Sequence, residues 1–175
     1  FFYNKQKYPN GAPFSNIWEL TEPKFRGIVG SKNPMSSGST LMAVMTIIQH
    51  PEEMADAYKR YSGKEIKLSS GVPHAGYEFW ARMLKNDLVL FKSGSKLAAA
   101  SGKADQDNPL IAFANMTYVA RNDSKGFVNG IVKDLDPIAK LLYPTFTAIA
   151  RQAPHPNAAK VFTDFVLGSR KLNKD

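Results

Sequence analysis

The sequence predicts an α/β fold, a single lobe of three layers in which a mostly parallel mixed sheet is flanked by helices. Short apolar segments alternate along the chain with segments of helical spacing, which is typical of a parallel sheet covered on both faces. The chain has 175 residues, of which 43% are hydrophobic and 11% aromatic, so it can bury a core. Because there is no internal repeat or low-complexity segment, we expect residues 1–175 to form one domain.

The first part of the chain predicts two strands, a polar loop and two helices. Residues 1–4 are apolar and aromatic and are typical of the end of a strand. Ser15 is placed as the N-cap of a short helix. Residues 27–30 predict a short buried strand, the polar residues 31–40 predict a loop, and the apolar stretch 41–48 predicts a helix.

The middle of the chain continues this alternation. A helix is expected to begin at Pro51, because proline is favoured in the first turn. Residues 65–68 alternate like a strand, and apolar residues recur at helical spacing over residues 77–84. Residues 87–91 predict a buried strand, and residues 96–100 predict the helix that follows it.

The last part of the chain predicts two more strands and a closing helix. Residues 110–114 are a buried-strand candidate, which residues 117–120 continue or restart. Residues 122–136 are polar and read as irregular. Residues 144–149 alternate and form the last predicted strand, and residues 157–167 predict a helix with one apolar face.

Composition limits the classes of function. The chain has no cysteine, which excludes thiolate metal sites and disulfides. No apolar run approaches the roughly 20 residues of a membrane-spanning helix. The formal net charge is +8, which indicates an anionic partner, but lysine and arginine are dispersed as on a solvated surface. No nucleic-acid-binding module is recognisable, so we expect no nucleic-acid partner.

Ligands of open α/β sheets bind beyond the carboxyl ends of the strands, where loops lead into helices. Three loops of this kind are small and polar. They supply the candidate ligand-binding residues Ser36, Ser37, Gly38, Ser39, Thr40, Ser93, Gly94, Asn115 and Tyr118.

The first loop offers hydroxyl groups, free backbone N–H groups and the positive end of a helix dipole, which together make an anion site. It lacks the spacing of a P-loop. The alternative is that one serine caps the helix and the rest is an ordinary turn.

In the second loop, Ser93 and Gly94 repeat the pattern, again with capping as the alternative. In the third, Asn115 is placed to hydrogen-bond a ligand and Tyr118 to stack on it or coordinate a metal. The alternative there is a β-bulge with Tyr118 in the core.

No pattern of catalytic residues is recognisable. His50, His74 and His155 lack metal-ligand spacing, and there is no G-x-S-x-G motif or pair of catalytic carboxylates. We therefore expect no enzyme activity, catalytic residue, metal or cofactor.

Four segments resemble, in order, the type 2 periplasmic-binding-protein superfamily, which includes ferric-iron, thiamine, phosphonate and sugar-phosphate binders of ABC importers. Residues 18–27 (WELTEPKFRG) are similar to its W-x-D-L-x-D-P-x-W-K-G segment, and residues 34–38 (PMSSG) to its P-x-S-S-G ligand loop. Residues 84–87 (LKND), together with Ser93, Lys96 and Leu97, resemble the segment before its second ligand loop. Residues 153–167 (APHPNAAKVFTDFVL) resemble its A-P-H-P-N-A-A-K-L-F-x-D-F-L-L-S helix.

This resemblance implies the second, inserted lobe of a two-lobe solute-binding protein with a periplasmic-binding-protein-like fold. The expected partners are the protein's own first lobe, which this chain lacks, and an ABC permease in the membrane. In that family the ligand lies in the cleft between the lobes, which close on it by a hinge motion. The implied location is periplasmic or extracellular, either free or as a lipoprotein.

The resemblance also implies roles for individual residues. Ser37, Gly38 and Ser39 resemble the anion-holding positions, and Ser93 and Asn115 resemble polar contacts from the other two loops. Iron-binding members carry two adjacent tyrosines after that asparagine, a pair that this sequence lacks. An anionic ligand of the phosphorylated-sugar or phosphonate type is therefore expected. A ferric-iron receptor with a synergistic anion is the alternative, and a basic nucleic-acid-binding domain is a remoter one.

Overall fold

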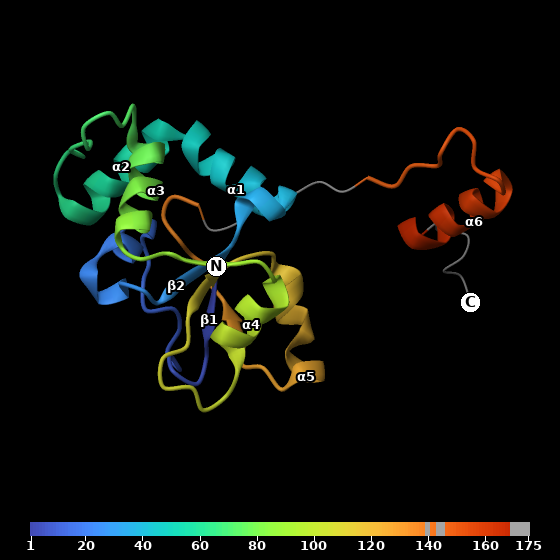
Figure 1. Cartoon of the computed structure of the whole chain (residues 1–175), viewed down its shortest axis with the longest axis horizontal. Coiled ribbons are helices and arrows are strands. Elements are labelled where there is room, and N and C mark those ends of the chain that lie inside the picture. The colour runs from blue at the N-terminus through green and yellow to red at the C-terminus, as the bar shows by residue number, and fades with distance from the viewer. Residues whose placement is uncertain (139–140, 143–145, 169–175) are drawn as a thin grey trace. The chain divides into compact units, whose positions relative to one another are not determined.

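The computed structural model describes residues 1–138, 141–142 and 146–168. The chain divides into two compact units, Phe1–Leu141 and Leu142–Asp175, and each is described by itself (Figure 1). That residues 1–175 form one domain stays a prediction.

Unit 1 is built on a five-stranded mixed sheet with the strand order β3-β2-β4-β1-β5. Its strands are β1 (Phe2–Asn4), β2 (Val29–Lys32), β3 (Val89–Phe91), β4 (Ile111–Phe113) and β5 (Asn129–Ile131). β2 is parallel to both β3 and β4, whereas β1 is antiparallel to both β4 and β5. The predicted α/β class with a mixed sheet is confirmed. The parallel pairings are confined to β3-β2-β4, and β1 is the strand that runs opposite to the other four.

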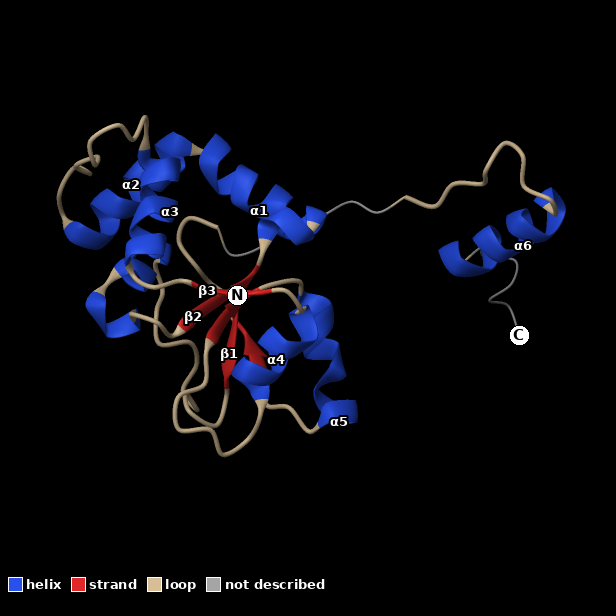
Figure 2. Ribbon diagram, viewed as in Figure 1, coloured by secondary structure: helices blue, strands red, loops and turns tan. Residues whose placement is uncertain are grey.

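Helices lie on both faces of this sheet (Figure 2). The α-helices of unit 1 are α1 (Gly38–Gln49), α2 (Pro51–Ser62), α3 (Ala75–Lys85), α4 (Gly94–Gly102) and α5 (Asn122–Lys125). Its short 3-10 helices are η1 (Ile17–Thr21), η2 (Pro23–Phe25), η3 (Pro34–Ser36) and η4 (Met116–Arg121). The helices predicted over residues 41–48, from Pro51, and over residues 77–84 and 96–100 are confirmed.

Two hydrophobic cores separate the sheet from its helices. The larger core joins one face of the sheet to η1, α2 and α3 and includes Trp18, Phe79 and Ile111, which are fully buried. The smaller core lies under α4 and includes Leu97 and Ala112. Because Ile111 and Ala112 are neighbours in β4, their side chains point to opposite faces. Unit 1 is therefore layered as helices, sheet and helix.

The first short helix begins one residue later than predicted. Its N-cap is Asn16 rather than Ser15, because the Asn16 Oδ1 accepts the N–H of Trp18 at 3.0 Å. The Glu19 carboxylate in turn accepts the N–H groups of Asn16 at 3.1 Å and Ser15 at 2.8 Å. This reciprocal capping box favours asparagine as the cap.

Several predicted strands are wrong. Residues 65–68 form no strand, and residues 117–120 lie in η4, whose turn begins because the Asn115 side chain accepts the N–H of Thr117. Residues 146–149 form no strand, and residues 144–145 lie outside the described part of the chain. Residues 122–136, predicted to be irregular, contain α5 and β5. Residues 87–91 do contain β3, but as an edge strand on which Leu90 is 49% exposed.

Unit 2 contains helix α6 (Pro156–Leu167), which confirms the helix predicted over residues 157–167. Gly168 ends it in a left-handed conformation with a φ of 67°. Taken by itself, this unit exposes the apolar residues of α6: Val161, Phe162, Phe165, Val166 and Leu167. Among the described helices of both units, none has the length and apolar character that a membrane crossing requires.

Candidate functional site

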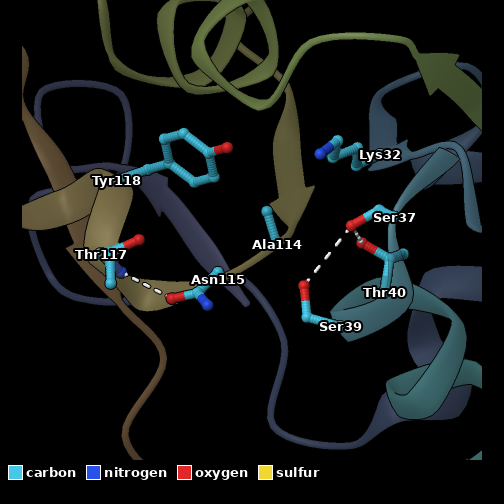
Figure 3. Close-up of a pocket in the computed structure, with 8 residues that line it drawn as sticks. All are labelled: Lys32, Ser37, Ser39, Thr40, Ala114, Asn115, Thr117 and Tyr118. Atoms are coloured by element: carbon cyan, nitrogen blue, oxygen red, sulfur yellow. Dashed lines mark hydrogen bonds between the residues drawn. The ribbon is translucent and has the colours of Figure 1, made fainter. Parts of the chain in front are cut away.

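The strand order creates a crevice at the carboxyl ends of β2 and β4. After β2 the chain passes to β3 at one edge of the sheet, whereas after β4 it passes to β5 at the opposite edge. The loops that leave β2 and β4 therefore diverge, which is where open α/β sheets bind ligands. A pocket of about 100 Å³ lies there. It is lined by Lys32, Ser37, Ser39, Thr40, Ala114, Asn115, Thr117 and Tyr118 (Figure 3).

Three hydroxyl groups at the start of α1 form one wall of the pocket. Ser37 and Thr40 are only 9% and 6% exposed, and the Thr40 hydroxyl donates to the Ser37 Oγ at 3.0 Å. The Ser37 and Ser39 Oγ atoms are 3.4 Å apart. Three hydroxyls joined by these two hydrogen bonds use two of their three protons. One proton therefore remains available to donate to a ligand.

The backbone at the same place adds further donors. Ser37 is the N-cap of α1, and the Leu41 N–H donates to the Ser37 carbonyl at 2.9 Å to begin the helical ladder. The N–H groups of Gly38, Ser39 and Thr40 come before that bond and have no intrahelical acceptor. These groups carry the positive end of the helix dipole, which favours an anion.

Lys32 supplies the positive charge of the pocket. It is the last residue of β2, it is partly buried, and its ammonium group points across the pocket toward Tyr118 (Figure 3). None of the lining residues is acidic, and the stretches 31–40, 91–100 and 111–121 contain no aspartate or glutamate. The site is therefore electropositive.

Lys32 was not among the residues predicted from the sequence, because the lysines of this chain are dispersed and form no cluster. The available signal was its place at a strand end, directly before the serine-rich loop.

The third loop forms the opposite wall. The Asn115 Oδ1 accepts the Thr117 N–H at 2.9 Å, which fixes the side-chain amide and leaves its NH₂ group free to donate to a ligand. Thr117, which the sequence analysis did not select, also lines the pocket. Tyr118 points its hydroxyl group into the pocket (Figure 3).

The second loop does not line this pocket. The Ser93 hydroxyl accepts the Lys96 N–H at 3.4 Å as the N-cap of α4, which is the capping alternative. Gly94 is buried against the hydroxyl end of the Tyr118 side chain, which leaves no room for a Cβ atom there. Ser36 also lies outside, because its exposed hydroxyl donates to the Asn33 carbonyl at 3.1 Å.

The structure thus brings together five of the nine candidates, namely Ser37, Ser39, Thr40, Asn115 and Tyr118. Gly38 adds a backbone N–H at the same helix start, and Ser36, Ser93 and Gly94 do not line the pocket. That any of these residues binds a ligand stays a prediction.

A second, more open hollow of about 340 Å³ is lined by Ser15, Asn16, Arg60, Tyr61 and Asp136. Its charges pair with each other, because the Arg60 Nη2 lies 2.5 Å from the Asp136 Oδ1. The Asn16 Nδ2 also donates to Asp136, at 2.9 Å. These contacts join α2 to the segment after β5, and they leave no uncompensated charge for a ligand.

Within residues 1–138, 141–142 and 146–168, no group of three or more histidine, cysteine, aspartate or glutamate side chains is placed to hold a metal ion. No family model, no curated protein and no solved structure matches this chain.

Proposed function

We propose that this chain is the ligand-binding lobe of a solute-binding protein of an ABC importer, and that it captures a small anionic solute of the phosphorylated-sugar or phosphonate type. The observation that carries the proposal is the pocket at the ends of β2 and β4. It combines one lysine, three hydroxyl groups and a helix N-terminus, and its lining has no acidic residue. The four sequence segments that resemble the family add the importer context.

In this function the lobe binds and releases its ligand without making or breaking a covalent bond. The N–H groups of Gly38 to Thr40 and the remaining hydroxyl proton hold the oxygens of the anion. Lys32 balances the negative charge, and the Asn115 amide orients the bound group.

The size of the pocket indicates which part of the solute this lobe holds. Its volume of about 100 Å³ is below the roughly 300–1,000 Å³ typical of sites that enclose a whole ligand. It has room for about three water molecules at about 30 Å³ each, which suits one oxyanion head group. The rest of the solute then extends away from this lobe, toward the first lobe of the two-lobe protein.

The test places a negative charge in the pocket without harming the helix. Ser37→Asp should abolish orthophosphate binding, because the new carboxylate repels the anion. Aspartate is a favoured N-cap, so α1 should stay intact. Binding is followed by NMR titration of the amide groups of residues 38–40, and folding by circular dichroism.

Ser93→Asp is the matched control, because it makes the same change at the N-cap of a helix whose start does not line the pocket. At physiological salt, where charges are screened over about 8 Å, this variant should bind orthophosphate like the wild type. Unchanged binding by a folded Ser37→Asp variant would rule out the anion site.

A further inference from the structure

The carboxyl edge of the sheet brings two helix starts near each other. α1 begins soon after β2 and α4 soon after β3, and these two strands are parallel neighbours. Each helix start presents backbone N–H groups and a positive dipole end. Two such ends facing one crevice would suit an anion with two charged groups.

Tyr118 prevents this arrangement. The hydroxyl end of its side chain lies against Gly94, the first residue of α4, so closely that a Cβ atom there would overlap the hydroxyl oxygen and the ring carbon that carries it. The same tyrosine lines the pocket and points its hydroxyl group into it, whereas no residue of α4 lines the pocket (Figure 3). The ring therefore stands between the pocket and the start of α4.

Neighbouring contacts hold this ring in place. The Arg121 guanidinium lies 5.4 Å from the centre of the Tyr118 ring, and the Arg121 Nη1 is 3.5 Å from the Ser95 Oγ on α4. Tyr118 also packs against the small core that contains Leu97 and Ala98. These contacts hold the Tyr118 side chain in place as one wall of the pocket.

We infer that Tyr118 determines the size of the anion that the site accepts: a single compact oxyanion head group fits, and a group with two linked phosphates does not. This inference rests on the proposed function, since it concerns the same pocket. It assigns Tyr118 a role in specificity that comes from the bulk of its phenol side chain, whose hydroxyl end lies against Gly94.

The experiment compares orthophosphate with pyrophosphate by NMR titration of the whole 175-residue chain. The wild type should bind orthophosphate at least about tenfold more tightly than pyrophosphate, the cost of forcing an oversized group into a packed site. Tyr118→Ala should remove most of this preference, because pyrophosphate then reaches the start of α4. Tyr118→Phe removes only the hydroxyl oxygen and leaves the ring against Gly94, so it should keep most of the preference. Tyr77→Ala, which removes an exposed tyrosine of α3, should keep all of it.

A second variant tests the wall from the other side. Gly94→Ala adds a Cβ atom that the Tyr118 ring must avoid, which pushes the ring into the pocket. It should weaken orthophosphate binding about tenfold in the presence of Tyr118 and have no effect in the Tyr118→Ala background. This comparison of Gly94→Ala in the two backgrounds remains informative even where Tyr118→Ala alone lowers the stability of the protein.

The outcomes separate the inference from the proposed function. A wild type that shows no orthophosphate binding overturns both. Wild-type binding with an equal affinity for pyrophosphate overturns the inference alone, and so does a preference that Tyr118→Ala leaves unchanged. Equal weakening by Gly94→Ala in both backgrounds also overturns it.

Discussion

Glu78 on α3 is a carboxylate that is only 1% exposed, and three hydrogen bonds hold it there. It accepts the Ser69 N–H at 2.8 Å, the Ser69 hydroxyl at 3.1 Å and the Arg82 Nε at 2.7 Å. The Arg82 Nη2 donates to the Lys67 carbonyl at 2.9 Å, and the guanidinium lies 5.5 Å from the centre of the Trp18 ring. These contacts fasten the loop between α2 and α3 to the larger core.

This network should make stability depend on acid. Burial acts to raise the pKa of Glu78, but the hydrogen bonds from Ser69 and Arg82 outweigh it, and the pKa lies below its ordinary value of 4.5. The stabilisation that Glu78 contributes is therefore complete above its ordinary pKa of 4.5. It is lost as the pH falls through the lower pKa that Glu78 has in the folded state. Glu78→Gln should lower the free energy of unfolding at neutral pH by about 2 kcal/mol and reduce this acid dependence, as measured by urea unfolding across pH.

The control for Glu78 is Glu65→Gln, which changes an exposed carboxylate paired with Lys59 and should leave stability unchanged. Equal effects of the two changes would contradict the role given to Glu78. Sequence patterns did not reveal this network, because residues 65–68 alternate like a strand. What decides their structure is the side chain of Glu78, which binds the adjacent Ser69 across the turn.

At the scale of elements, the close approach of α1 and α3 depends on Gly76. A Cβ atom at this position would lie 2.6 Å from the Ile47 carbonyl oxygen and 2.7 Å from the Ile48 Cα. Both are backbone atoms, so one helix must move. Gly76→Ala should therefore lower the free energy of unfolding by about 1–3 kcal/mol, as measured by urea unfolding.

The control is Gly38→Ala at the start of α1, where nothing lies within 4 Å of an added Cβ. Alanine is the better helix former, so this variant should be as stable as the wild type or more stable by up to about 1 kcal/mol. A Gly76→Ala variant of wild-type stability would contradict the close packing of α1 on α3.

Elements with a strong local pattern were predictable, and those that depend on distant partners were not. Pro51, the acidic first turn of α2 and the left-handed Gly63 after it mark that helix without any tertiary contact. In contrast, β5 is short and contains Asn129, which is buried because its amide donates to the Ala98 carbonyl at 3.2 Å. A buried asparagine held by a distant helix leaves no periodic signal.

The same distinction applies to the candidate site. Its serine-rich loop was predictable, since small polar residues at a helix start are a local feature. Lys32 and Thr117 were not, because the pairing of β2 with β4 is what brings their loops together.

At the scale of the whole molecule, the question is whether anion binding comes from the pocket or from the net charge of +8. Lys32→Gln and Lys64→Gln each remove one positive charge, but only Lys32 lines the pocket. We expect Lys32→Gln to weaken orthophosphate binding about tenfold, the loss of one charged hydrogen bond, and Lys64→Gln to have no effect. Calorimetry or NMR titration measures both, and equal weakening would indicate attraction by the overall charge alone.

The position of β1 between β4 and the edge strand β5 also bears on the order in which unit 1 can fold. β5 joins the sheet through β1, where Phe2 pairs with Ile131 on one side and with Ala112 on the other. The first strand therefore cannot find its neighbours until most of unit 1 has been synthesised, and its pairing closes a very long loop. Such distant pairing slows folding, and the pairs that join β2 to β3 and β4 are closer in the sequence, so we expect β1 and β5 to join the sheet after them. β1 then completes the sheet as a late step, which adds β5 and covers the second edge of β4.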